Sequence, residues 1–245
     1  MSEALKVSVV VDFLLDHRHV GSAQVDIVLL AVGADGIVGT EMVAKAPADG
    51  YVLGFIPSSP VAMNPALYKL PYDPIKDFAP IGRIANTPAL LLVHPSLPVK
   101  TLADLIALAK ARPGKLTYAS GSAGTLVPGA MLTSIAGIDM LHVPYKSIPL
   151  GLNDVVAGQV DMMFTDMATG TPQVKGGKLR ALGVSSAAPV PALPDVPPIA
   201  QTLKGFELLA WYAMYAPAGT PAPVIDRLNR ELRAFVGNPA TQERL

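Results

Sequence analysis

The 245-residue chain is 51% apolar and only 16% charged, and its 19 basic and 19 acidic residues leave no formal net charge. This length and apolar content suffice for one large α/β domain or two lobes of ordinary size, and they exclude an intrinsically disordered chain. The balanced charge, without any charge run, argues against nucleic acid and anionic membrane as partners, and the absence of cysteine excludes disulfides and thiolate catalysis.

The N-terminal part begins with MSEALKVSVVVDF, which lacks a basic stretch and a small-residue cleavage site, so we expect no signal peptide. The longest apolar run, near Val25 to Val32, is too short to span a bilayer. Residues 32–65 are then predicted to form a loop, a helix, a strand, a loop and a helix. Within them, residues 33–39 miss the dinucleotide-binding fingerprint by one position, and we interpret them as a tight turn.

The central block is predicted most clearly, because strands and helices alternate at short spacing. A helix over residues 101–111 has Thr101 as its N-cap and Asp104 in its first turn, and Pro113-Gly114 ends it. It is followed by strand 115–120, a helix from about Thr125 to Ala136, strand 140–144, helix 149–158, strand 159–164, a short helix and strand 179–186. Such alternation predicts a mostly parallel sheet with right-handed crossovers.

Two long strands, near residues 88–94 and 208–215, bracket this block. After the second of them, Thr220-Pro221 is expected to cap a last, amphipathic helix. The arrangement predicts a second lobe inserted into a first and joined to it by a two-strand hinge. The first lobe is expected at residues 1–94 and 212–245, and the second at residues 95–211.

Catalytic and metal-binding patterns are mostly absent. The chain has no G-x-S-x-G nucleophile elbow and no G-x-x-x-x-G-K-[ST] phosphate loop. His17 and His19 could be drawn as a metal site with neighbouring aspartates, but Arg18 between them favours a solvated loop. His142 lies in a predicted strand and is interpreted as a structural histidine. Asp161 is expected to face outward from its strand, whereas Asp166 follows the strand end and is the better candidate to face a ligand.

The most informative segment is TYASGSAGTLVPGA, residues 117–130, where a strand ends in small residues before a helix begins. The small residues are Ser120, Gly121, Ser122, Gly124 and Thr125. They would let an anion approach backbone N–H groups, and the helix N-terminus adds unpaired donors and the positive end of its dipole. These features favour a carboxylate or phosphate ligand, and the alternative is an ordinary capped turn that binds nothing. Pro128 is expected in the first turn, where a missing N–H is tolerated.

Several longer stretches occur together and in order. They are residues 67–88 (LYKLPYDPIKDFAPIGRIANTP), 93–125, 142–164 (HVPYKSIPLGLNDVVAGQVDMMF), 177–186, 193–201 and 216–229. With these phrases, the chain from about Gly33 to Leu245 resembles the Bordetella-uptake-gene receptors, the substrate-binding proteins of tripartite tricarboxylate transporters. The resemblance implies a periplasmic-binding-protein fold of type II, in which two α/β lobes joined by a two-strand hinge close on a small organic acid.

The resemblance also implies which residues meet the ligand, because in this family the ligand's carboxylates meet small-residue loops and helix N-termini of both lobes. In the second lobe, the loop from Ser120 to Thr125 matches the carboxylate site. Tyr145 and Lys146 match the family's PYK turn, and Asp166 matches a polar position after a strand end. In the first lobe, the matching residues are Ser58, Ser59 and Asn64.

The chain departs from the family's pattern at both ends. The proline-glycine loop that opens the first lobe in the family is not found, the secretion signal is absent, and the chain stops at GNPATQERL where relatives continue. Ser147 stands where the family usually has glycine after PYK. We therefore expect a receptor truncated at both ends, periplasmic by resemblance, which without a signal peptide would be cytoplasmic if expressed as written.

Four functions are open at this point. The first is an extracytoplasmic receptor that binds a di- or tricarboxylate without metal or cofactor and delivers it to the membrane permease subunits of a tripartite transporter. The second is a ligand-binding sensor that signals to a two-component system. The third is a degenerate fragment of such a receptor that binds nothing. The last is an enzyme using Ser122 or Asp166, which the missing elbow, base–nucleophile pair and cofactor motif disfavour.

Overall fold

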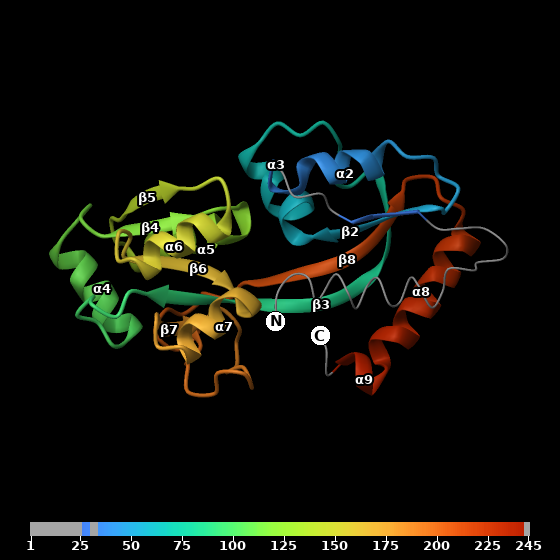
Figure 1. The fold of residues 1–245 in the computed structure, drawn as a ribbon. Coiled ribbons are helices and arrows are strands. Elements are labelled where there is room, and N and C mark those ends of the chain that lie inside the picture. The colour runs from blue at the N-terminus through green and yellow to red at the C-terminus, as the bar shows by residue number, and fades with distance from the viewer. Residues whose placement is uncertain (1–25, 30–33, 243–245) are drawn as a thin grey trace. The chain divides into compact units, whose positions relative to one another are not determined.

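The structure, a computed structural model, describes residues 26–29 and 34–242 (Figure 1). By its internal contacts the chain divides into unit 1, Met1–Asn86 with Trp211–Leu245, and unit 2, Thr87–Ala210. Strands β3 (Phe78–Val93) and β8 (Leu209–Pro217) run through the two boundaries. The lobe limits expected from the sequence, at 94/95 and 211/212, stay a prediction.

Unit 1 is built on a small mixed sheet. Strand β1 (Asp26–Leu29) pairs in parallel with β2 (Val52–Pro57), and β2 pairs antiparallel with β8. Its other elements are η1 (Ala34–Gly36), α2 (Ile37–Ala44), the π-helical turn η2 (Ser59–Met63), α3 (Asn64–Leu67), α8 (Ala222–Gly237) and α9 (Pro239–Gln242). Of the tight turn predicted at residues 33–39, residues 34–36 form η1, where Asp35 and Gly36 have positive φ, and residues 37–39 are the first residues of α2.

The alternation of side chains along β2 explains why both faces of this sheet are covered. Leu53 belongs to a buried cluster with Leu228 and Leu232 of α8, whereas Ile56 packs in a second cluster with Val43 of α2. Helices α2 and α8 therefore cover opposite faces (Figure 1). The N-cap of α8 is Pro221, as expected from Thr220-Pro221. The Thr220 hydroxyl does not act as a helix cap, because it donates to the carbonyl of Pro217.

Unit 2 is a larger sheet in the strand order β7-β3-β6-β4-β5. The strands after β3 are β4 (Thr117–Ser120), β5 (Leu141–Pro144), β6 (Met162–Asp166) and β7 (Arg180–Val184). The helices are α4 (Leu102–Ala111), α5 (Ala123–Ala136), α6 (Ile148–Val156), α7 (Met167–Lys175) and the short η3 (Ile199–Gln201). The predicted parallel pairing holds for β4 with β5 and with β6, but β3 runs antiparallel to both β6 and β7.

Helices cover both faces of the unit 2 sheet. Successive strand residues point to opposite faces, so two neighbouring residues of β4 show which helices pack on each. Tyr118 of β4 belongs to the cluster that contains residues of α4 and α5, whereas its neighbour Ala119 belongs to the cluster that contains residues of α6. From β4 the chain passes through α5 to β5 on one side, and from β5 it returns through α6 to β6 on the other. The carboxyl ends of β4 and β5 therefore form a topological switch point, where α/β sheets bind ligands.

The helix starts follow from their capping residues, with one correction. At α4, the predicted Thr101 cap is confirmed as a capping box with Asp104. At α5, the helix begins at Ala123 with Ser122 as its N-cap, two residues before the predicted start. Pro128 is consequently the sixth helical residue and not a first-turn residue, so the carbonyl of Gly124 lacks its usual intrahelical donor.

Candidate functional site

The loop between β4 and α5 is held together by one hydroxyl. The Thr125 side chain, in a residue only 3% exposed, accepts hydrogen bonds from the N–H groups of Gly121 (2.9 Å) and Ser122 (3.2 Å). It also donates to the Ser122 carbonyl (3.0 Å), which uses its full hydrogen-bonding capacity. The N–H groups of Gly121 and Ser122, which the small residues were expected to open to an anion, are therefore engaged by this hydroxyl. A ligand at this loop has to replace the Thr125 hydroxyl as their acceptor or use neighbouring donors.

This loop packs directly against the start of α6. A Cβ added to Gly121 would overlap the backbone of Ser147 and Ile148, so no other residue fits there without a backbone shift. The Ser120 carbonyl also accepts from the Tyr145 N–H at 2.7 Å. The starts of α5 and α6, which belong to helices on opposite faces of the sheet, therefore lie side by side at the switch point. The small size of Gly121 reflects this close approach.

The two adjacent helix starts differ in charge from the other helix starts of unit 2. No acidic residue stands in the first turn of α5 or of α6. Helix α4 instead carries Asp104 in its first turn, and α7 has Asp166 as its N-cap. Because helix N-termini carry partial positive charge, the α5 and α6 starts present adjacent positive ends with no carboxylate of their own. An anion is favoured there.

Asp166 has a clear structural role in the described part of the chain. Its two carboxylate oxygens accept from the N–H and the hydroxyl of Thr169, each at 2.9 Å. Its contact with a ligand stays a prediction. The outward orientation expected for Asp161 is wrong, because its carboxylate accepts from the N–H (2.8 Å) and hydroxyl (2.9 Å) of Thr117 and so joins the beginnings of β6 and β4.

The PYK turn precedes α6 and is anchored on it. The Tyr145 hydroxyl donates to the Asp154 carboxylate at 2.6 Å, and this hydrogen bond, with burial, raises the pKa of Tyr145 to about 12. The Tyr145 ring also lies against Gly151, where an added Cβ would come within 3.1 Å of it. Lys146, the next residue, is exposed. Its positive charge at this turn suits an anionic ligand.

His142 and Ser120 form a contact that was not predicted from the sequence. Ser120, the last residue of β4, is 5% exposed, and its Oγ lies 2.7 Å from Nε2 of His142 on β5. The imidazole stacks on Tyr118, with ring centroids 4.9 Å apart. Burial lowers the pKa of His142. The two residues are 22 positions apart, so only the register of β4 and β5 brings them together.

The predicted residues of the first lobe lie in unit 1. Ser58 and Ser59 are at the start of η2, where Ser58 is buried. Asn64 is fully buried at the start of α3, and its Nδ2 donates to the Asp35 carbonyl at 3.2 Å. Its Oδ1 has no hydrogen-bond partner among the described residues. Buried acceptors without partners are uncommon in folded proteins, and this one is open to a water or ligand donor.

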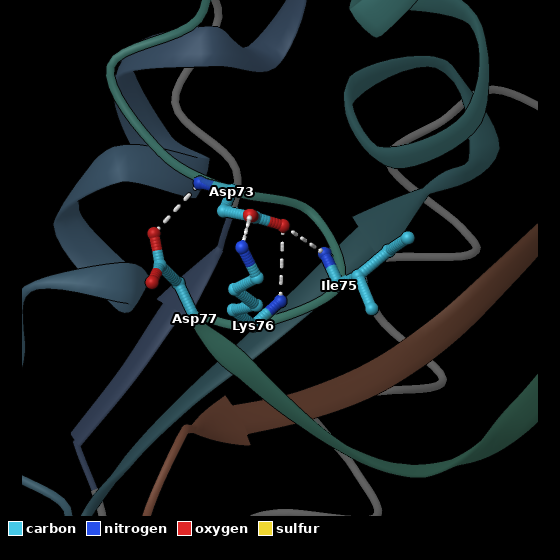
Figure 2. Close-up of polar contacts among 4 residues, drawn as sticks. All are labelled: Asp73, Ile75, Lys76 and Asp77. Carbon is cyan, nitrogen blue, oxygen red and sulfur yellow. Dashed lines mark hydrogen bonds and ion pairs between the residues drawn. The ribbon is translucent and has the colours of Figure 1, made fainter.

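The turn at residues 73–77 is a surface feature of unit 1 (Figure 2). The Asp73 carboxylate accepts from the N–H groups of Ile75 (2.9 Å) and Lys76 (3.1 Å), and Asp77 accepts from the Asp73 N–H at 2.7 Å. The turn borders an open depression of about 610 Å³ whose lining includes Tyr68, Asp73 and Asp77. Two carboxylates in the lining make it a poor site for an organic anion.

Two further searches concern chemistry other than anion binding. Within residues 26–29 and 34–242, no three His, Asp or Glu side chains converge as a metal site would require. In the same ranges, no helix has the length and apolar character to cross a membrane. The histidine pair His17 and His19 lies outside the described residues.

Comparison with known proteins gives a consistent result. The profile described as "Tripartite tricarboxylate transporter family receptor" matches residues 19–245. The UPF0065 protein in the tcbD-tcbE intergenic region of Pseudomonas sp. (strain P51) is 37% identical over 218 residues, which cover 87% of this chain and 65% of the relative. The chain spans 62–65% of the length of three such curated relatives.

Solved structures of similar fold include two with a bound acid. Rpa4515 of R. palustris with adipate is 31% identical, with a TM-score of 0.87 over 100% of this chain and 82% of that one. MatC from Rhodopseudomonas palustris with bound malate is 30% identical, with a TM-score of 0.76 over 87% and 74%. The periplasmic binding protein BugD is 36% identical, with a TM-score of 0.76 over 86% and 72%. The fold is thus that of the periplasmic solute-binding proteins.

Proposed function

We propose that this chain, which belongs to the tripartite tricarboxylate transporter family of receptors, binds a small organic di- or tricarboxylate and delivers it to a membrane permease. The chain would act outside the cytoplasm, as the periplasmic relative BugD does by its name. Binding requires no chemical step. The protein would act as a carrier of the ligand and not as an enzyme.

The observation that carries this proposal is the pair of adjacent helix starts without an acid. The β4–α5 loop and the first residues of α6 meet at the carboxyl ends of β4 and β5, and neither helix has an acidic residue in its first turn. An anion placed there gains the dipoles of two helices and charge-assisted hydrogen bonds from backbone N–H groups. The adipate and malate bound by two structural relatives are anions of this kind.

The internal acceptor at this loop is compatible with ligand exchange. Thr125 offers a neutral hydroxyl to the N–H groups of Gly121 and Ser122. Replacing that hydroxyl by a carboxylate oxygen exchanges neutral hydrogen bonds for charge-assisted ones, which are roughly twice as strong. The N–H of Gly124, the second residue of α5, has no intrahelical acceptor by its position and adds a further donor.

A thermal-shift panel tests the proposal. The full chain is heated with malate, adipate or citrate, and with adipamide as the uncharged analogue of adipate. At about 100 times the dissociation constant, binding stabilises the folded state by about 2.7 kcal/mol, and Tm should rise by about 5–10 °C. Equal shifts with adipate and adipamide, or no shift with any acid, would contradict the proposal. Chemical conversion of a bound acid would contradict the non-enzymatic part of it.

A further inference from the structure

We propose that His142 is a positioning residue of the carboxylate site, whose Nε2–H holds the Ser120 oxygen so that the hydroxyl proton is directed to the ligand. The inference rests on the proposed function, since it concerns the same loop. It assigns a role to a histidine that the sequence alone suggests to be structural.

The first support is the geometry of the pair. Ser120 is the residue at which β4 ends and the candidate loop begins. Its carbonyl is held by the Tyr145 N–H, and its Oγ is 2.7 Å from His142 Nε2. Both polar groups of Ser120 beyond its own N–H are therefore fixed by β5 and the turn that follows it. These contacts leave only the direction of the hydroxyl proton to be determined.

The second support is the fixed position of the imidazole. Its ring stacks on Tyr118 at 4.9 Å with an interplanar angle of 29°. The Tyr118 ring in turn lies against Gly129 of α5, where an added Cβ would come within 2.7 Å of it. Helix α5, Tyr118 and His142 thus form a packed series that ends at the Ser120 hydroxyl. A ring held on its face in this way presents Nε2 in one direction.

The third support is the hydrogen-bond inventory of the pair. A serine hydroxyl has one proton, and a carboxylate ligand can only accept hydrogen bonds. If Nε2 is unprotonated, Ser120 must give its proton to the imidazole and shows the ligand only lone pairs. If Nε2 carries a proton, the imidazole donates to Ser120 and the serine proton is available to the carboxylate. Carboxylate binding therefore selects the form of His142 that is protonated at Nε2.

The test is a double-mutant cycle read by the affinity for malate, adipate and citrate, measured by calorimetry on the full chain. Ser120→Ala and His142→Leu should each weaken binding about tenfold or more, because each removes the same hydrogen bond to a charged group. The affinity of the double variant should lie within about twofold of the affinity of the weaker-binding single variant. His142→Gln, whose amide N–H can replace Nε2–H, should recover most of the affinity lost in His142→Leu.

A matched histidine supplies the control. His94 makes a similar contact in the same unit, with Nδ1 2.6 Å from the Ser96 hydroxyl. It lies beside Asp161 at the beginning of β6, whereas the candidate loop follows the carboxyl end of the parallel strand β4. His94→Leu should leave affinity unchanged. The role of His142 would be overturned if the affinity loss of the double variant equalled the product of the two single losses, or if His142→Gln recovered no affinity. Either result would leave the proposed function intact. Absence of binding by the unaltered chain would overturn both.

Nitrogen-15 NMR of the imidazole tests the protonation state that the proposed role requires. With ¹⁵N-labelled histidine, the ring shifts report which nitrogen carries the proton. Saturation with the bound acid should leave His142 protonated at Nε2. A bound complex in which only Nδ1 is protonated would overturn the inference, because Ser120 would then have no proton for the ligand.

Discussion

The starts of α4 and α5, both in unit 2, use the same capping geometry with different chemistry. In each helix the third residue turns back and accepts hydrogen bonds from the N-cap N–H and from the N–H before it. In α4 the acceptor is the Asp104 carboxylate, at 2.9 Å from both amides. In α5 it is the Thr125 hydroxyl, at 2.9 and 3.2 Å. Helix α4 therefore carries its own anion, and α5 does not.

This difference in the charge of the cap indicates which helix start can accept an anionic ligand. A ligand carboxylate at α4 would meet a fixed negative charge that already occupies the same two amides. At α5 it would meet a neutral acceptor and, beside it, the α6 start, which also lacks an acid. Small residues alone do not make the distinction, because Gly121 is small for a packing reason. The charge of the internal capping residue therefore determines which helix start can accept an anionic ligand.

The largest effect is expected from giving α5 the acid that α4 has. Thr125→Asp should preserve the capping geometry, because Asp104 performs it in α4. It should weaken binding of malate or adipate by at least about a hundredfold, since like charges placed together cost several kcal/mol. Calorimetry measures the affinity, and thermal unfolding checks that the variant is folded.

The reciprocal variant, Asp104→Thr, is the matched control. It gives α4 the neutral acceptor of α5 and should leave the affinity within about twofold, because Asp104 is not part of the candidate site. An equal loss of affinity in both variants would mean that the charge at the α5 start is not what matters.

The next largest effect is expected at the contact between the α5 and α6 starts. Gly121→Ala would force the loop away from the backbone of Ser147 and Ile148. We expect a loss of about 2–3 kcal/mol in the free energy of unfolding, as for other overpacked sites, together with weaker binding. Urea denaturation measures the stability. Gly237→Ala, at a helix end where an added Cβ meets no atom within 4 Å, should change it by less than about 0.5 kcal/mol.

The smallest effect is a difference in acid sensitivity between the two helix starts. Backbone N–H bonds, first that of Lys100, lower the pKa of Asp104 below its usual value. A lowered folded-state pKa means that this stabilisation is present above about pH 4 and is lost as the pH falls through the folded-state value. The α4 start should therefore loosen in acid, whereas the Thr125 cap has no group that titrates there.

Amide hydrogen exchange at low pH measures this difference, after correction for the intrinsic pH dependence of exchange. Lys100 and Thr101 should lose protection as the pH falls below about 4, relative to Gly121 and Ser122. Equal losses at the two helix starts would show that the charge of the cap has no separate contribution.

Much of the fold could be predicted from the sequence because its signals are local. The Thr101 cap of α4 and the alternation of strands and helices both follow from neighbouring residues. The orientation of β3 was missed, because a strand that arrives from unit 1 carries no local mark of its direction. Ser122 and Thr125 are both good capping residues, and the predicted start near Thr125 fell two residues after the observed start at Ala123.

The site was less predictable, because its contacts join residues far apart in sequence. The loop was predicted as a place for an anion, and its small residues were attributed to ligand access. The approach of the Ser147 backbone to Gly121 gives a different reason for one of them. Similarly, Asp161 was expected to face outward, and its bonds to Thr117 depend on the pairing of β4 with β6.

The most direct test follows the backbone N–H signals of the two helix starts by NMR while malate or adipate is added. The account predicts that the signals of Gly121 and Ser122 shift and saturate with the acid, whereas those of Lys100 and Thr101 stay in place. Saturable binding of the acid with unchanged Gly121 and Ser122 signals would contradict the central claim that the β4–α5 loop holds the carboxylate.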